Sequence, residues 1–141
     1  MLKARDIKSG DIVAVKKFKK QYTSREEAFS EREVQVLQKF NHPNLVRAKK
    51  FHFHEGILYI VFEFLEMELT SFMKEKQLKE GRKLNEEEIK TIMRQILYGI
   101  EYIHSKGYMH RDIKPENFII NPKSLELKMI DFGTCREYTN C

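Results

Sequence analysis

The chain has 141 residues, which is enough for a folded domain with a hydrophobic core of its own. Hydrophobic residues make up 41% of it and charged residues 33%, a balance typical of a soluble globular protein rather than a disordered chain. No apolar run approaches the roughly 20 residues that a membrane-spanning helix needs, so we expect no membrane association.

The formal net charge is +5, and basic residues cluster at positions 16–20 and 47–50. Such runs could bind nucleic acid or an acidic partner. Solvated strand ends explain them more simply, so no nucleic-acid partner is expected.

The chain has two cysteines, Cys135 and Cys141, both close to its last residue. They are too few for a disulfide framework or a cysteine-rich zinc site. No secretory signal is recognisable after Met1. These features predict a reducing, intracellular location, in the cytoplasm, the nucleus or both.

Residues 1–18 are predicted to form the end of one strand, a turn at Ser9 and Gly10, and a second strand. The second strand is the β-prone run at residues 12–15, which we expect to end at Lys16. A lysine at a strand end is usually solvated, so this stretch alone does not decide whether Lys16 has a function.

Ser24 followed three residues later by Glu27 is a capping-box pattern, which predicts the start of a single helix running to Phe40. Glu33 falls on the apolar stripe of that helix. Because a carboxylate on a buried face needs a cation, we predict that Glu33 pairs with Lys16. The alternative is a slight rotation of the helix that lets Glu33 reach water.

A hairpin is predicted after Pro43, with aromatic and apolar strands at residues 51–54 and 57–64 and a turn at Glu55 and Gly56. His52 and His54 would share one face of the first strand, as two metal ligands could. No third ligand lies near them in the sequence, so solvated histidines are the simpler interpretation.

Two helices are predicted next, the first over residues 69–78 with Gly81 beyond its end. Asn85 and Glu88 form a capping box for the second, and Gly107 follows its end. The second helix carries a stripe so wide that it needs cover on more than one side. The stripe consists of Ile89, Ile92, Met93, Ile96, Leu97, Ile100 and Ile103.

The most informative stretch is residues 110–117 (HRDIKPEN), followed by residues 131–133 (DFG). Asp112, Asn117 five residues later and Asp131 after a short apolar strand are what a phosphate-transfer site requires. One carboxylate can accept or orient the proton of an attacking hydroxyl, while the Asn oxygen and the second carboxylate can hold Mg²⁺. A polar hairpin turn is the alternative.

These motifs, with the VAVK stretch at residues 13–16, resemble those of eukaryotic Ser/Thr protein kinases. The resemblance implies an α+β, protein-kinase-like two-lobed fold, here truncated. Residues 1–65 would form a partial N-lobe and hinge, β-rich with one helix and without the glycine-rich loop. Residues 66–141 would form the first part of the helical C-lobe and end in the activation segment.

Shorter stretches are similar to the group of cyclin-dependent and mitogen-activated kinases. They lie at residues 3–5, 32–34, 41–44 and 61–64. Residues 133–136 (GTCR) are similar to the male-germ-cell-associated kinase branch of that group. Arg32 with Arg111 resembles its basic pocket for a phosphorylated activation-loop residue, although a solvated Arg32 is the alternative.

The resemblance also implies that ATP and Mg²⁺ are the cofactors and that proteins are phosphorylated on Ser or Thr. Asp112 would be the catalytic base, Lys114 the contact to the γ-phosphate, and Asn117 and Asp131 the Mg²⁺ ligands. The implied ATP-binding positions are Ala14 and Ile119 on either side of the adenine, Lys16 on the phosphates with Glu33 holding it, Phe62 behind the adenine, the backbone of Glu63 and Leu65 at its edge, and Glu68 at the ribose.

Two functional hypotheses follow from the sequence. The first is an ATP-dependent Ser/Thr protein kinase with a protein substrate and a possible regulatory protein partner. The second is a catalytically inactive, truncated kinase fold that acts as a binding or regulatory module. Without the glycine-rich loop and the later helices, we expect these residues alone to be marginally stable and nearly inactive.

Overall fold

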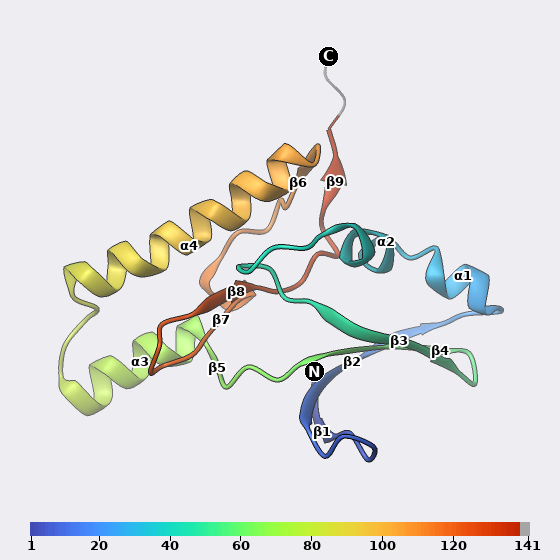
Figure 1. Cartoon of the computed structure of the whole chain (residues 1–141), viewed down its shortest axis with the longest axis horizontal. Coiled ribbons are helices and arrows are strands. Elements are labelled where there is room, and N and C mark those ends of the chain that lie inside the picture. The colour runs from blue at the N-terminus through green and yellow to red at the C-terminus, as the bar shows by residue number, and fades with distance from the viewer. Residues whose placement is uncertain (139–141) are drawn as a thin grey trace. The chain divides into compact units, whose positions relative to one another are not determined.

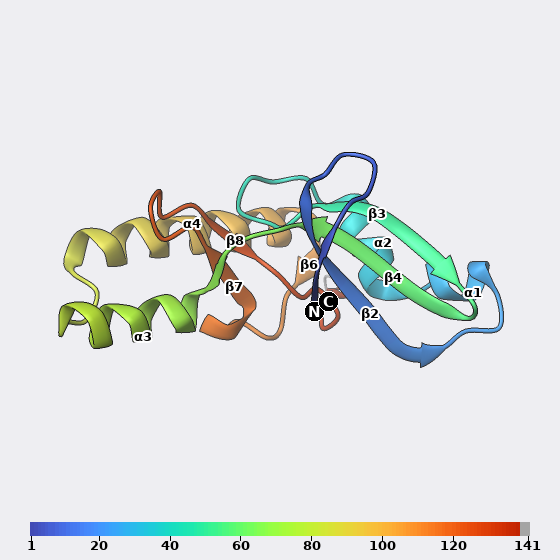
Figure 2. The ribbon, with the colours of Figure 1, turned by 90° about the horizontal axis from the view of Figure 1, so that it is seen from below.

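The computed structural model describes residues 1–138, which fold into two compact units. Unit 1 comprises Met1–Asn41 and Val46–Phe64, and unit 2 comprises His42–Leu45 and Leu65–Cys141. Unit 1 is built on a four-stranded antiparallel sheet, and unit 2 contains the two longest helices (Figures 1 and 2). The strands pair antiparallel and occur together with helices, so the predicted α+β class is confirmed.

The sheet of unit 1 has the strand order β1-β2-β4-β3, with every neighbouring pair antiparallel. Its strands are β1 (Leu2–Arg5), β2 (Ile12–Gln21), β3 (Ala48–His54) and β4 (Ile57–Glu63). The β3–β4 turn is the predicted one, with positive φ angles of 48° at Glu55 and 76° at Gly56. The predicted end of β2 at Lys16 is wrong, because Lys16 and Lys17 still pair with Ile60 and Tyr59 of β4.

The single helix predicted in unit 1 is in fact two, α1 (Arg25–Phe29) and α2 (Arg32–Lys39). Ser24 caps α1 as predicted, accepting a hydrogen bond from the Glu27 N–H at 3.1 Å. The break comes at Glu31, whose backbone is extended with φ −54° and ψ 135°. Its carboxylate accepts a hydrogen bond of 2.9 Å from the Tyr22 hydroxyl. Glu31 is thus tied to the residue that follows β2, and α2 begins at the next residue.

Unit 2 is organised around α3 (Leu69–Glu80) and α4 (Glu86–Ser105). A second sheet, in the order β5-β7-β8, packs with them; α4 contacts β8, and α3 contacts β5 and β7. The remaining elements are β5 (Met67–Glu68), β6 (Tyr108–Met109), the 3₁₀ helix η1 (Pro115–Asn117), β7 (Phe118–Ile120), β8 (Leu127–Met129) and β9 (Arg136–Glu137). Within residues 1–138, no helix combines the length and apolar character needed to cross a membrane.

A buried amide network fixes α4 to the β7–β8 hairpin of unit 2. The Asn44 side chain donates to the Gln95 side-chain oxygen at 3.2 Å and to the Leu127 carbonyl at 2.9 Å. The Gln95 amide in turn donates to the Leu125 carbonyl at 2.7 Å. Since buried polar groups are costly unless paired, this network specifies how the hairpin sits on α4.

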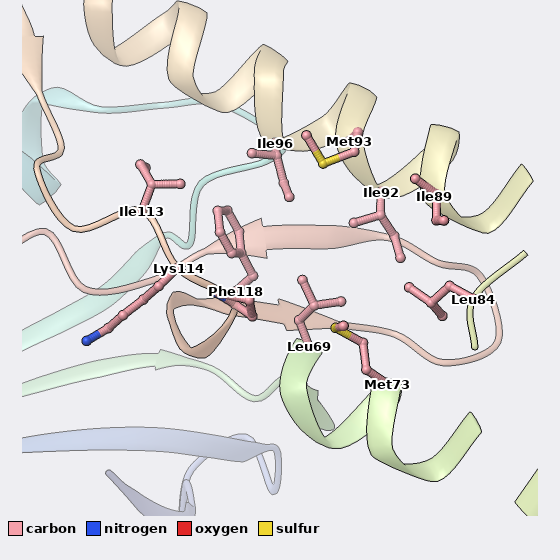
Figure 3. A pocket seen from close by; sticks show the side chains of 11 residues that line it. Leu69, Met73, Leu84, Ile89, Ile92, Met93, Ile96, Ile113, Lys114 and Phe118 are labelled. Carbon is pink, nitrogen blue, oxygen red and sulfur yellow. The ribbon is translucent and has the colours of Figure 1, made fainter. Parts of the chain in front are cut away.

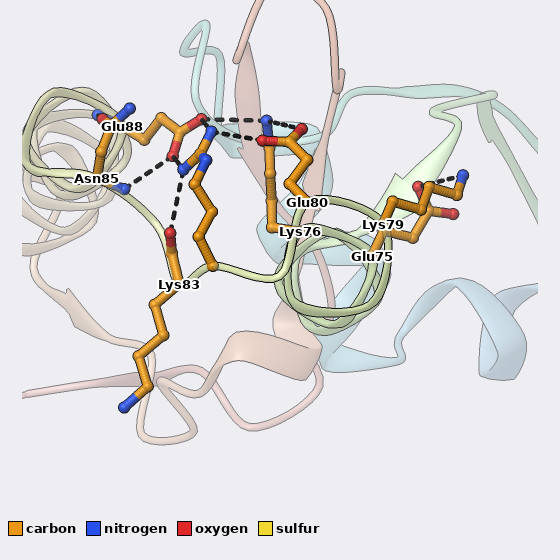
Figure 4. A network of polar contacts seen from close by, with 8 residues as sticks. Glu75, Lys76, Lys79, Glu80, Lys83, Asn85 and Glu88 are labelled. Carbon is orange, nitrogen blue, oxygen red and sulfur yellow. Dashed lines mark hydrogen bonds and ion pairs between the residues drawn. The ribbon is translucent and has the colours of Figure 1, made fainter.

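A second polar network joins the end of α3 to the start of α4 (Figure 4). Asn85 accepts a hydrogen bond from the Glu88 N–H at 2.8 Å and donates its own N–H to the Glu88 carboxylate at 2.9 Å, which completes the predicted capping box. The same carboxylate contacts Arg82 at 2.9 Å and Lys76 at 3.2 Å. Chiefly through the hydrogen bonds from Arg82 and from the Asn85 N–H, the pKa of Glu88 falls to about 2.

We expect the Glu88→Gln variant to unfold more easily than the wild type at neutral pH, by about 1 kcal/mol. The folded-state pKa of about 2 lies below the ordinary value of 4.5, so the carboxylate stabilises the fold above pH 4.5 and loses that effect as the pH falls toward 2. Urea unfolding across this range measures the difference. Glu87→Gln, which removes an exposed carboxylate one residue earlier, is the control; identical pH profiles for the two variants would contradict the prediction.

Candidate functional site

One face of the unit 1 sheet brings together three of the predicted site residues. In the β2–β4 ladder Ala14 lies opposite Phe62, and Lys16 lies opposite Ile60. Side chains alternate between faces along a strand, so all four point to the same side. Ala14 and Phe62 are buried, which gives this face an apolar surface beside the Lys16 ammonium.

The predicted pair between Lys16 and Glu33 is present in the structure. The Lys16 Nζ donates to both carboxylate oxygens of Glu33, at 2.9 and 2.7 Å. The Glu33 side chain is only 5% exposed and that of Lys16 is 29% exposed. The alternative in which Glu33 rotates into water is therefore wrong. The pair holds the ammonium in one position on the sheet face.

Of the other predicted nucleotide-binding positions, Glu63 and Glu68 end strands, Ile119 lies within β7 and Leu65 lies outside the strands. Glu63 is the last residue of β4 in unit 1, and Leu65 follows it as the first residue of a segment of unit 2. Within unit 2, Glu68 occupies the N-cap position of α3 and lies opposite Ile119 in the β5–β7 ladder. The second sheet thus places Glu68 and Ile119 side by side, although 51 residues separate them in the chain.

The loop at residues 110–117 holds the Asp112 carboxylate in a fixed orientation. The Asn117 amide donates to the Asp112 carbonyl at 2.8 Å and to its Oδ2 at 3.0 Å. The Lys114 Nζ lies 3.5 Å from the same Oδ2. Because both side-chain contacts use Oδ2, Oδ1 is the oxygen best placed to accept a proton from another molecule.

The backbone around the loop is strained at two non-glycine residues. Arg111 has a φ of 73° and Asp131 a φ of 62°, conformations that cost roughly 1–3 kcal/mol each and persist only when the surroundings fix them. Here the surroundings are the buried Phe132 ring, which packs edge-on against the His110 ring at 5.8 Å, and a 2.7 Å hydrogen bond from Thr134 to the His110 carbonyl. Burial lowers the pKa of His110, which favours the neutral imidazole.

The β7–β8 hairpin brings together the two predicted metal ligands. Asn117 immediately precedes β7 and Asp131 follows β8, and the Ile130 N–H donates to the Asn117 carbonyl at 2.8 Å. The amide nitrogen of Asn117 is used on Asp112, which leaves its side-chain oxygen for a cation. An amide oxygen and a carboxylate are ligands that suit Mg²⁺.

Within the part of the chain that the structure describes, no group of three or more His, Cys, Asp or Glu side chains could hold a metal ion. The predicted magnesium ligands are one amide and one carboxylate, so water or phosphate oxygens would have to complete the coordination shell. This is the usual way in which proteins bind Mg²⁺. The residues present therefore fit a magnesium ion that arrives with a phosphate.

The structure also shows an apolar groove in unit 2, with a volume of about 360 Å³ (Figure 3). Its walls come from α3, α4 and the loop that carries Lys114. Leu84 and Ile89, on either side of the capping residue Asn85, both line it. Ile89 and Met93 remain 47% and 45% exposed, so the wide stripe predicted on α4 is only partly covered.

Comparison with known proteins yields one family. Residues 1–141 match the family model described as protein kinase domain. The chain is 40% identical to cyclin-dependent kinase F-3 of Oryza sativa subsp. japonica over 99% of its own length, 39% identical to the rat serine/threonine-protein kinase ICK over 97%, and 37% identical to the mouse serine/threonine-protein kinase MAK over 97%. It spans 31%, 21% and 21% of those three proteins.

We expect the buried pair to show strong coupling in a double-mutant cycle. Glu33→Gln alone should destabilise unit 1 by about 1–3 kcal/mol, because it leaves a half-buried ammonium with a weaker partner. Adding Lys16→Met should recover part of that loss, since no unpaired charge then remains. Thermal unfolding of the two single variants and the double variant measures the coupling; purely additive effects would count against it.

Proposed function

The chain belongs to the protein kinase domain family, and from this premise we propose that the protein containing it transfers the γ-phosphate of ATP to Ser or Thr side chains of other proteins. The observation that carries the proposal is the fixed Asp112 carboxylate, held by Asn117 and approached by Lys114. A carboxylate so held can take the proton of an incoming hydroxyl without reorganising.

The side chains of unit 2 have separate roles in this proposal. Asp112 orients the substrate hydroxyl and accepts its proton through Oδ1. Lys114 contacts the γ-phosphate, and its 3.5 Å separation from Asp112 places a positive charge next to the reacting atoms. Asn117 and Asp131 would hold Mg²⁺, which when bound neutralises charge on the phosphates.

The nucleotide-binding roles rest on the sheet faces already described. Lys16, held by Glu33, binds the α- and β-phosphates, as the resemblance to kinases implies. Ala14 and Phe62 offer a dry apolar surface to the adenine. The remaining contacts in the proposal are Ile119 with the adenine ring, the backbone of Glu63 and Leu65 with its edge, and Glu68 with the ribose.

A regulatory protein is also part of the proposal. One relative carries the name cyclin-dependent kinase F-3, so we propose a cyclin-like partner for the protein of which these residues are part. Such a partner could act by changing the Lys16–Glu33 pair. Glu33 lies in the first turn of α2, so a shift of this helix would weaken the pair and release the lysine.

The second candidate is a catalytically inactive kinase fold that binds or regulates other proteins. The observation that favours it is the partly exposed apolar groove between α3 and α4. Phosphotransfer separates the two candidates. Incorporation of labelled phosphate from ATP into a mixture of protein substrates supports the first, and its absence alongside normal ATP binding supports the second.

We expect Asp112→Asn to lower the rate of phosphotransfer by about 10²- to 10⁴-fold, because the hydroxyl loses its proton acceptor. ATP affinity should stay within about threefold, since Asp112 contacts the substrate hydroxyl rather than the nucleotide. Initial-rate kinetics and nucleotide titration measure the two effects. Glu126→Gln, a change to an exposed carboxylate beside β8, is the matched control and should leave both unchanged.

We expect Asp131→Asn to raise the Mg²⁺ concentration needed for half-maximal phosphotransfer by roughly tenfold or more, because a neutral amide binds Mg²⁺ less tightly than a carboxylate. Rates measured across a Mg²⁺ titration at saturating ATP test this. If the variant is slow at every Mg²⁺ concentration without a shift in the midpoint, Asp131 is not a metal ligand.

A further inference from the structure

The face of the unit 1 sheet that points away from Lys16 has a hollow of about 550 Å³. Its floor is apolar and comes from the alternate residues of β2 and β4, namely Val13, Val15, Tyr59 and Val61. The opposite face is the one on which Glu33 of α2 reaches Lys16. We call this hollow the outer shelf. Alternation along the strands therefore gives the sheet two chemically different faces.

The rim of the outer shelf is positively charged. Arg5, Lys49 and Lys50 line it, against the single carboxylate of Asp6. That carboxylate already accepts hydrogen bonds from the Lys8 N–H at 2.8 Å and the Ser9 N–H at 3.2 Å. These bonds, with a smaller effect of the nearby lysines, lower the pKa of Asp6. Within residues 1–138, neither Lys49 nor Lys50 forms an ion pair, and their charges act on Asp6 only as a minor effect, so both can meet an outside anion.

Two histidines extend the rim along β3. The rings of His52 and His54 stack at 6.0 Å with planes 18° apart, and the His52 ring lies 6.2 Å from that of Tyr59. Both histidines are exposed. Imidazole rings in this arrangement offer polar nitrogens and flat surfaces in a row beside the apolar floor.

We propose that the outer shelf is a docking site for an extended, acidic segment of a partner protein that carries an apolar or aromatic side chain among its carboxylates. The four strands span roughly 14 Å, wide enough for one or two inserted side chains. The cationic rim complements the flanking carboxylates and would direct their approach.

Two simpler explanations account for less of the geometry. Lysines on an edge strand prevent unwanted strand pairing, which explains the charge on β3 but not the hollow with an apolar floor beside it. A nucleic acid would also be attracted to the rim. Its affinity would come mainly from phosphate contacts, and its bases could stack only on Tyr59 and the two histidines, which leaves the valines of the floor without a partner. A protein segment matches both the floor and the rim.

Fluorescence anisotropy with the 141-residue chain tests the proposal. The probe is a labelled peptide with glutamates on both sides of a phenylalanine, and the matched peptide has glutamines in their place. We expect the glutamate peptide to bind saturably and the glutamine peptide not to bind. Replacing Lys49 and Lys50 together by Gln should weaken it roughly three- to tenfold. Replacing the exposed Lys74 and Lys123 together by Gln makes the same charge change in unit 2, and should alter binding less than about twofold.

Several outcomes would overturn the docking site. Equal weakening by both double variants would mean general charge attraction, and equal binding of the glutamine peptide would mean that the rim takes no part. Tighter binding of a single-stranded oligonucleotide than of the peptide would assign the shelf to nucleic acid. Amide chemical shifts in the unaltered chain give a second measurement that does not depend on variants folding. Binding without shifts at Tyr59 and Val61 would place the peptide elsewhere.

Discussion

The buried side chain of Asn117 is the constraint on which the candidate catalytic geometry depends. Its amide donates twice to Asp112, and its backbone carbonyl accepts the N–H of Ile130, the residue before Asp131. One residue thus sets the orientation of the proposed proton acceptor and the spacing of the two proposed Mg²⁺ ligands. A shorter side chain could not span these contacts, and an aspartate could not donate to the carboxylate. The strained φ angles of Arg111 and Asp131 flank this network, and the Phe132–His110 packing and the Thr134 hydrogen bond help to hold them.

The Lys16–Glu33 pair plays the corresponding part in unit 1. Placing two charges on a largely buried face costs desolvation energy, so the pair contributes more to position than to stability. It also makes the ammonium's place depend on α2, a helix of eight residues that begins after a break in the chain. The residue at the break, Glu31, is held by a hydrogen bond from Tyr22. A short, independently anchored helix of this kind is suited to regulation, because a modest displacement would change the site.

The two faces of the unit 1 sheet differ in how their basic side chains are paired. On the face with Lys16 the cation is paired with a buried carboxylate, whereas the lysines that line the outer shelf, Lys49 and Lys50, form no ion pair among residues 1–138. The sequence contains both sets of basic residues in similar-looking runs at positions 16–20 and 47–50. Only the tertiary structure shows that Lys16 shares a face with Glu33 while Lys49 and Lys50 line the shelf. A run of basic residues in a sequence can therefore be assigned a role only when the sheet face that it occupies is known.

The sequence by itself determined the features that local chemistry controls. The Asn85–Glu88 capping box, the Glu55–Gly56 turn and the spacing from Asp112 to Asn117 are short-range patterns, and the structure reproduces them. Tertiary structure decided where distant segments compete with local preference. It split the predicted helix at Glu31 and carried β2 past Lys16. It also gathered Lys49 and Lys50, with other residues distant in the chain, on one sheet face. The reason is physical: capping and turn preferences act over a few residues, whereas strand pairing and long-range hydrogen bonds become visible only when the chain has folded.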